Sequence, residues 1–129
     1  MNYLLDTQAV IWSLDGDHRL SEEAKAAIED TQNTLSITVI SLWEIAIKRS
    51  IGKLKLTASL MDIQNLISTK EVSMLPLTVE HLETLETLAY QEKHRDPFDR
   101  LIISQAITEN LTLISNDTHF RDYPVQILW

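Results

Sequence analysis

Cysteine is absent from this 129-residue chain, and glycine occurs only twice. Without cysteine the protein has no disulfide framework and no thiolate metal site. Two glycines, Gly16 and Gly52, are too few for a glycine-rich phosphate-binding loop, and no nucleophile-elbow motif supports Ser/His/Asp catalysis. No basic segment leads into a long apolar run, so we expect neither a signal peptide nor a membrane span. We therefore expect a cytoplasmic protein.

Positive charge is also scarce, since 11 Lys and Arg face 19 Asp and Glu for a formal net charge of −8. This balance argues against nucleic-acid binding, which usually needs a basic face, although bound divalent ions would cancel part of the charge. The distribution is uneven, because the stretch between Glu44 and Asp62 contains no acid. Its basic residues are candidates for RNA or partner contacts, or they belong to a solvated helix end and loop: Lys48, Arg49, Lys53 and Lys55.

Short β-prone runs alternate with helical patterns along the whole chain. Apolar or β-branched runs predict strands at residues 2–5, 34–38, 72–76, 111–115 and 125–128. Apolar residues at helical spacing and N-cap signals predict helices at 9–14, 21–30, 41–52, 60–68, 78–89 and 96–110. Such alternation predicts an α/β fold with a mostly parallel sheet covered on both faces. Residues 1–129 fit one compact domain.

Four carboxylates fall where such a sheet would gather them. Asp6 and Asp117 come directly after predicted strands, and Glu44 and Asp99 lie in the first turns of predicted helices. If the first strand is near the centre, Asp6 and Asp117 are neighbours at the topological switch point, where such sheets bind ligands. Four carboxylates brought together repel one another unless a cation is present. An all-oxygen cluster favours Mg²⁺ or Mn²⁺ over zinc.

Each acid also has a structural alternative. Asp6 could cap the following helix, and Asp117 could belong to a turn. Ser41 and Glu44 fit the capping-box pattern Ser-x-x-Glu. In Asp96-Pro97-Phe98-Asp99 the first aspartate is an N-cap and the proline takes the first helical position, which explains Asp99 only in part. The metal-site hypothesis therefore depends on the four acids as a group.

The histidines and tryptophans indicate no chemistry of their own. No histidine has a partner at metal-ligand spacing, and we expect all four at the surface: His18, His81, His94 and His119. We expect the tryptophans to pack in the core and at its edge instead of stacking on bases: Trp12, Trp43 and Trp129.

Four motifs in order resemble one known family, the PIN-domain ribonucleases, and within it the VapC-type toxins of bacterial type II toxin–antitoxin pairs. The match spans essentially the whole chain, including its last seven residues, 123–129. The motifs are Leu4-Leu5-Asp6-Thr7 with Ile11-Trp12, Ser41-Leu42-Trp43-Glu44-Ile45, Asp96-Pro97-Phe98-Asp99-Arg100-Leu101-Ile102, and Ser115-Asn116-Asp117 with Phe120.

The resemblance implies a three-layer α/β/α fold around a five-stranded parallel sheet. It assigns Asp6, Glu44, Asp99 and Asp117 as the cluster that holds Mg²⁺ or Mn²⁺. Asp96 belongs to the Asp-Pro-Phe-Asp-Arg signature of the subgroup, and we keep it as a supporting N-cap. It also implies an antitoxin partner that blocks the site and toxin homodimers. The run 47–54 resembles a feature of the subgroup, which suggests that the basic stretch is more than solvated surface.

The chemistry implied is hydrolysis of an RNA phosphodiester by metal-activated water, leaving a 5′-phosphate and a 3′-hydroxyl. Asp6 and Asp99 are the expected direct ligands, Asp117 and Glu44 complete the site, and the general base stays open. Thr7, and Ser115 or Asn116, could orient waters or phosphate oxygens. Arg100 either pairs with an acid or contacts RNA.

Two other classes of protein compete with this interpretation. A phosphoacceptor signalling module would also place an Asp after a strand, but it needs adjacent acids there and a Lys after the last long strand. Asp6 stands alone and that Lys is missing. The other alternative is a non-catalytic acidic α/β domain that only binds partners.

Overall fold

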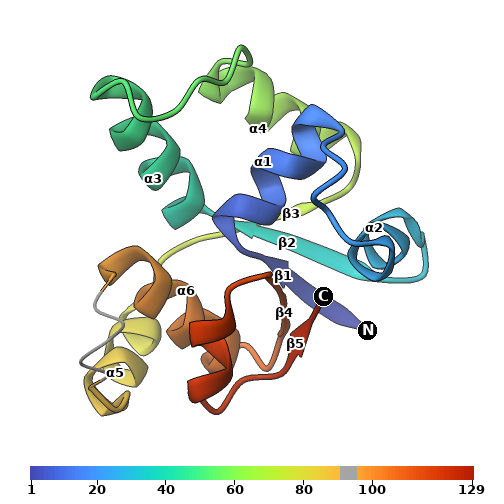
Figure 1. Ribbon diagram of the computed structural model, residues 1–129. Coiled ribbons are helices and arrows are strands. Elements are labelled where there is room, and N and C mark those ends of the chain that lie inside the picture. The colour runs from blue at the N-terminus through green and yellow to red at the C-terminus, as the bar shows by residue number, and fades with distance from the viewer. Residues whose placement is uncertain (91–95) are drawn as a thin grey trace.

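The computed structural model describes residues 1–90 and 96–129, and its centre is a five-stranded sheet (Figure 1). Its strands are paired in the order β3-β2-β1-β4-β5, and every pairing is parallel. The predicted strands are confirmed, with shorter bounds at the chain's later strands: β1 (Asn2–Leu5), β2 (Thr34–Thr38), β3 (Ser73–Leu75), β4 (Thr112–Ile114) and β5 (Ile127–Leu128).

Strand β1 lies at the centre of the sheet, as the metal-site hypothesis requires. Leu4 is in register with Ser36 of β2 on one side and with Leu113 of β4 on the other. At the end of β1, the Asp6 amide donates to the carbonyl of Ile114, 3.1 Å away. The carboxyl ends of β1 and β4 are therefore neighbours at the switch point of the sheet.

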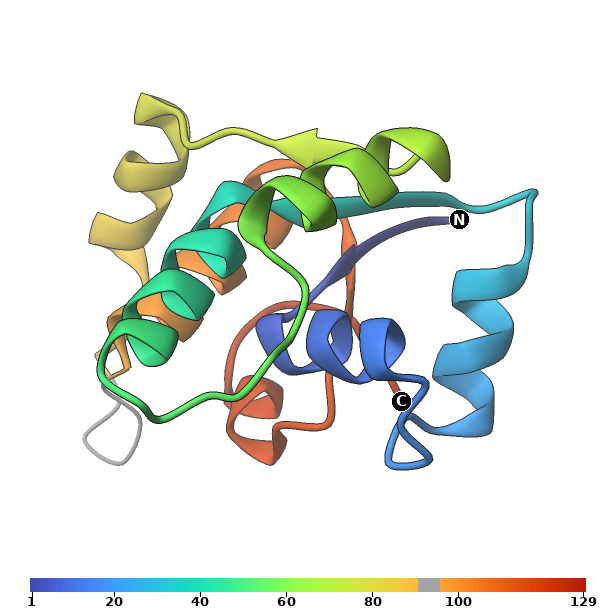
Figure 2. The same cartoon turned by 90° about the horizontal axis from the view of Figure 1, so that it is seen from above.

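Helices cover both faces of the sheet, so the predicted three-layer α/β/α architecture is confirmed (Figures 1 and 2). Alternate side chains of β1 enter different cores, because successive residues of a strand point to opposite faces. Tyr3 and Leu5 pack with α1, α2 and α4, whereas Leu4 packs with α6, α5 and a short 3₁₀ helix, η1. The bounds are α1 (Thr7–Asp15), α2 (Glu22–Glu29), α3 (Val39–Ser50), α4 (Leu60–Thr69), α5 (Val79–Thr87), α6 (Pro97–Thr108) and η1 (Thr118–Asp122).

Helix α3 follows β2 directly and begins earlier than predicted. Its N-cap is Thr38, whose hydroxyl accepts a hydrogen bond from the Ile40 amide at 3.1 Å. The capping box predicted for Ser41 and Glu44 is therefore wrong, because both residues lie inside the helix and are buried. The N-cap predicted for α6, Asp96, is confirmed, and the N-cap signals at the starts of α2 and α5 are Ser21 and Thr78.

His81 is buried, which contradicts its predicted place at the surface. Its Nδ1 accepts a hydrogen bond from the Thr78 amide at 3.0 Å, and its Nε2 lies 2.9 Å from a carboxylate oxygen of Glu109. The ring therefore completes the capping box of α5 and ties that helix to the end of α6. His94 lies outside the described residues. The other two histidines, His18 and His119, are exposed as expected.

Across residues 1–90 and 96–129, we find no helix with the length and apolar character needed to cross a bilayer.

Candidate active site

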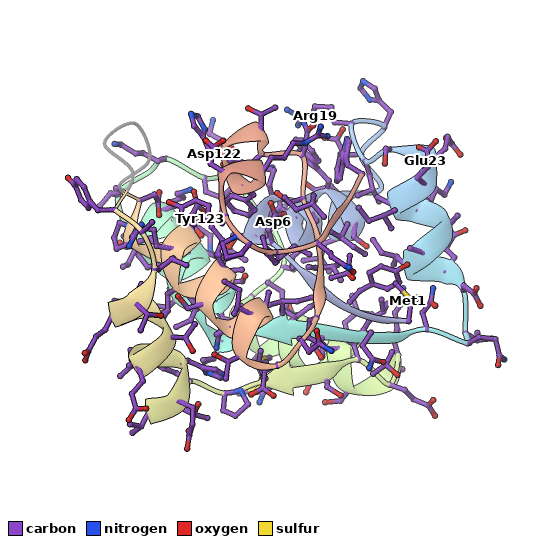
Figure 3. All side chains as sticks on the ribbon, turned by 90° about the horizontal axis from the view of Figure 1, so that it is seen from below. Met1, Asp6, Arg19, Glu23, Asp122 and Tyr123 are labelled. Carbon is purple, nitrogen blue, oxygen red and sulfur yellow. The ribbon has the colours of Figure 1, made fainter. Side chains whose placement is uncertain are left out.

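The carboxyl ends of β1 and β4, together with α1, α3 and α6, surround a pocket of about 390 Å³. Asp6 lies near the middle of the molecule seen from below, in contrast to the peripheral Arg19 and Glu23 (Figure 3). The pocket contains all four predicted carboxylates. Its lining residues are Asp6, Thr7, Gln8, Ile11, Trp12, Glu44, Lys48, Asp96, Asp99, Asn116 and Asp117.

Asp6 is buried and serves two purposes. Its Oδ1 accepts a hydrogen bond from the Ala9 amide at 2.7 Å, so it caps α1. Burial raises the pKa of Asp6 to about 6; hydrogen bonds from Ser115 and Ala9 act against this rise, and the charges of Asp99 and Asp117 add to it. The capping alternative is therefore confirmed for Asp6, and Asp6 also lies close enough to two other predicted carboxylates for their charges to act on it.

Glu44 is buried in α3, and both of its carboxylate oxygens are engaged. The Thr7 hydroxyl donates to Oε1 at 2.7 Å, and the Lys48 ammonium donates to Oε2 at 2.6 Å. Because Thr7 has only one hydroxyl proton, its 2.9 Å contact with the Ser41 hydroxyl then requires Ser41 as the donor. Thr7 thus holds Glu44 in place, and its possible role in orienting water or phosphate oxygens stays a prediction.

The N-cap role predicted for Asp96 is confirmed, whereas the metal-ligand role of Asp99 stays a prediction. Asp96 is exposed and caps α6, with its Oδ1 accepting hydrogen bonds from the amides of Phe98 at 2.9 Å and Asp99 at 3.1 Å. Asp99 lies half-buried in the first turn of α6, where its charge acts on Asp6. Asp96 also lines the pocket, so its role in cleavage needs a separate test.

Replacing Asp96 tests whether it is only a cap. Asp96→Ser should leave cleavage and stability nearly unchanged, because serine is an equally good N-cap. Asp96→Ala should lower the free energy of unfolding by roughly 0.5–2 kcal/mol, because the amides of Phe98 and Asp99 lose their acceptor. Urea unfolding and an RNA cleavage assay measure the two effects. An inactive but fully folded Asp96→Ser variant would assign Asp96 to the site itself.

Asp117 is the N-cap of η1, so the turn role that the sequence left open is present. Its Oδ1 accepts from the His119 amide at 2.9 Å and lies 3.1 Å from His119 Nδ1. Its own amide donates to the Ser115 hydroxyl at 3.0 Å, and Ser115 also hydrogen-bonds Asp6. Ser115 thus joins the two strand-end aspartates, a structural use that differs from orienting water.

The basic residues after Glu44 do not form one surface. Lys48 points into the pocket, and Arg49 donates to the carbonyls of Leu56 and Ala58, which holds the loop after α3. Lys53 and Lys55 are exposed in that loop. Of these four basic residues, only Lys53 and Lys55 are exposed enough for the predicted contact with RNA or a partner.

Arg100 ties α6 to its neighbours. Its guanidinium donates to the carbonyl of Ala89 at 3.0 Å, to the carbonyl of Leu88 at 3.3 Å and to the Tyr123 hydroxyl at 3.2 Å. It also lies over the Tyr123 ring. These neutral acceptors give Arg100 a packing role that neither of our two expectations described.

The sequence model of the PIN domain family matches residues 3–126, nearly the whole chain. The chain belongs to the PIN domain family. PIN domains are in general nucleases that use divalent metal ions. A comparison with curated proteins finds no match to the sequence.

Several solved structures have similar folds, and one of them is described as a toxin–antitoxin complex. The PIN domain matches VapBC2 from Rickettsia felis, bound to a promoter DNA fragment, with a TM-score of 0.70 and 19% identity over 99% of this chain and 98% of that one. A toxin–antitoxin complex from Klebsiella pneumoniae matches with a TM-score of 0.64 and 20% identity, over 98% of this chain and 96% of that one. FitAcB from Neisseria gonorrhoeae matches with a TM-score of 0.60 and 17% identity, over 98% of this chain and 96% of that one. At such identities the likeness shows the shared fold.

The donor set of this PIN domain fits a hard divalent ion, because its pocket offers only carboxylates as charged ligands and they already repel one another at Asp6. Within the described ranges, no three acidic or histidine side chains are grouped as a ready metal site. Two of the acids have other partners, because Glu44 is held by Thr7 and Lys48, and Asp117 is held by His119. A bound ion would share these carboxylates with their present partners or displace them.

Sequence reasoning missed part of the pocket wall. Gln8, Ile11 and Trp12 line it from one side of α1, and their spacing of three and four residues was a usable signal. Lys48 was expected at a contact surface, yet its position four residues after Glu44 already predicted the pairing.

Proposed function

We propose that residues 1–129 form a single PIN domain that acts in the cytoplasm as the toxin of a type II toxin–antitoxin pair. Its activity would be that of an endoribonuclease dependent on Mg²⁺ or Mn²⁺. The observation that carries this proposal is the pocket at the switch point, where Asp6, Glu44, Asp99 and Asp117 meet in a PIN fold. The raised pKa of Asp6, caused mainly by burial, supports a site built to receive a cation.

Asp6 and Asp99 would hold the ion, and Glu44 and Asp117 would complete the site. A bound ion lowers the pKa of its water and neutralises charge on the phosphoryl oxygens. Thr7 keeps the Glu44 carboxylate oriented, and Ser115 keeps Asp6 and Asp117 together. With water as the nucleophile the products carry a 5′-phosphate and a 3′-hydroxyl.

Incubating the purified protein with structured RNA, in Mg²⁺ or in EDTA, tests this function. We expect cleavage in Mg²⁺ and none in EDTA, with ends that a 5′-phosphate-dependent exonuclease can degrade. Intact RNA in Mg²⁺ would favour one of the two alternatives, a phosphoacceptor or a binding module. Equal cleavage in EDTA would contradict the metal-dependent mechanism.

An antitoxin that blocks the pocket is the proposed protein partner. The support is the fold shared with a chain of the Klebsiella pneumoniae structure, which is described as a toxin–antitoxin complex, and with chains of VapBC2 and FitAcB. The exposed Lys53 and Lys55 offer a docking site for an acidic segment of such a partner, in competition with RNA.

A homodimer is the proposed assembly, and an exposed apolar stripe on α3 supports it. Val39, Trp43, Ile47 and Ile51 follow one another at four-residue spacing, and they are 39%, 54%, 36% and 59% exposed. Trp43 packs edge-on against Phe98 yet leaves more than half its surface in solvent, more than we expected for a packing residue. A continuous apolar stripe on one helix face is typical of a helix–helix interface.

Replacing Ile47 with Glu should convert the dimer to a monomer, because it places a charge in the middle of the stripe. The matched control is Met61→Glu on α4, which is also exposed but lies outside the stripe. Size-exclusion chromatography with light scattering measures the mass of each variant. A wild-type monomer, or an Ile47→Glu variant that stays dimeric, would contradict an interface on α3.

A further inference from the structure

Among the described residues that line the acidic pocket, Lys48 carries the one positive charge. Its ammonium lies 2.6 Å from Glu44 Oε2. The Glu44 side chain is 5% exposed and the Lys48 side chain 45%, so the lysine reaches the buried carboxylate from the solvent side. Lys48 therefore stands between solvent and one of the proposed metal-binding carboxylates.

With this contact, both oxygens of Glu44 already accept a hydrogen bond. Thr7 occupies Oε1 and Lys48 occupies Oε2. The Thr7 contact is neutral and internal, whereas the Lys48 contact is ionic and faces the pocket opening. A cation that reaches Glu44 through the pocket opening would share Oε2 with Lys48 or displace it.

The whole cluster, not Glu44 alone, acts on this lysine. Lys48 lines the same pocket as Asp6, Asp99 and Asp117, so the negative charges of these carboxylates act on its ammonium group together with that of Glu44. The carboxylates that would attract a divalent ion thus already attract an ammonium group. The Lys48 ammonium and a divalent metal ion would therefore be attracted by the same carboxylates.

We propose that Lys48 is the resident counter-ion of the pocket, which holds Glu44 in place and competes with divalent metal for that carboxylate. This inference rests on the proposed function. It makes Lys48 a positioning residue that sets how much Mg²⁺ or Mn²⁺ the enzyme needs. The simpler alternative is a helix-stabilising pair four residues apart, which would not affect metal affinity.

Titration calorimetry with Mn²⁺, without RNA and at constant ionic strength, tests the proposal. Lys48→Met should bind Mn²⁺ roughly tenfold more tightly than the wild type, the order expected for removing one partly screened charge near the surface. Lys48→Arg keeps the charge and should resemble the wild type. Lys53→Met removes the same charge from an exposed loop position outside the pocket and should also resemble the wild type.

The same titration separates failure of this inference from failure of the proposed function. If the wild type binds no Mn²⁺, or if Asp99→Asn binds it as well as the wild type, the metal site itself is wrong. If Asp99→Asn weakens binding but Lys48→Met does not strengthen it, only the counter-ion role is overturned. In a cleavage assay, Lys48→Met should reach half of its own maximal rate at a lower Mn²⁺ concentration than the wild type, and an equal or higher concentration would also overturn the role.

Discussion

The Asp99→Asn variant should lose RNA cleavage by more than about 100-fold, beyond the loss usual for residues that only support a ligand. Asp99 lies in the first turn of α6 and its charge already acts on Asp6 across the pocket. The amide keeps the size of the side chain but removes the negative charge. Asp122→Asn is the matched control, because Asp122 is exposed and does not line the pocket. Full activity of purified Asp99→Asn would refute its role as a ligand.

Asp6→Asn should be equally inactive and yet fold well, because asparagine is as good an N-cap as aspartate and can still accept from the Ala9 amide. The folded-state pKa of about 6, against 3.8 for an ordinary Asp, means that the wild type loses stability as pH rises between these values. Asp6→Asn has no carboxyl group to ionise at this position, so it does not lose stability in this way. In EDTA at pH 7.5 the free energy of unfolding of Asp6→Asn should exceed that of the wild type by on the order of 1 to 3 kcal/mol, and the difference should be smaller at pH 4.5. Urea unfolding at both pH values measures the difference.

Replacing Lys53 and Lys55 together with Gln should weaken RNA binding and reduce its salt dependence. Both lysines are exposed in the acid-free loop after α3, whereas Lys48 and Arg49 are engaged within the protein. Each lost phosphate contact should lower the slope of log affinity against log salt by roughly 0.7–0.9. Binding is measured at several salt concentrations in the Asp99→Asn background, so that the RNA stays intact.

The control for this pair removes the same charge elsewhere. Lys25 and Lys70 are exposed on α2 and at the end of α4, and their double Gln variant should keep the wild-type slope. Metal affinity should hold in both double variants. An unchanged slope for the Lys53 and Lys55 variant would exclude RNA contact and leave partner binding or solubility as the role of these lysines.

Local patterns in the sequence were sufficient to predict the layers and the clustering of the acids. The runs before Asp6 and Asp117 predicted strands, and a parallel sheet brings their carboxyl ends to one edge. Side-chain partners across the fold could not be predicted this way. His81 is buried because Glu109, 28 residues later, accepts from its ring, and Glu44 meets Thr7 across 37 residues. No local pattern encodes such contacts.

The capping and metal-binding interpretations of the acids proved compatible. Helices begin at the carboxyl edge of a parallel sheet, so their free amides gather where the ligands must lie. Asp6, Asp96 and Asp117 each accept hydrogen bonds from such amides. These bonds stabilise negative charge in the pocket, and that lets the protein fold with several carboxylates close together.

Anomalous diffraction from a crystal soaked in Mn²⁺ tests the central claim most directly. We predict a peak in the pocket at the carboxyl ends of β1 and β4, with carboxylate oxygens of Asp6 and Asp99 at about 2.0–2.3 Å from the ion. The peak should be absent from Asp99→Asn crystals soaked in the same way. A peak bound by other residues, or an empty pocket in a protein that Mn²⁺ activates for cleavage, would contradict the assignment of these carboxylates as the metal site.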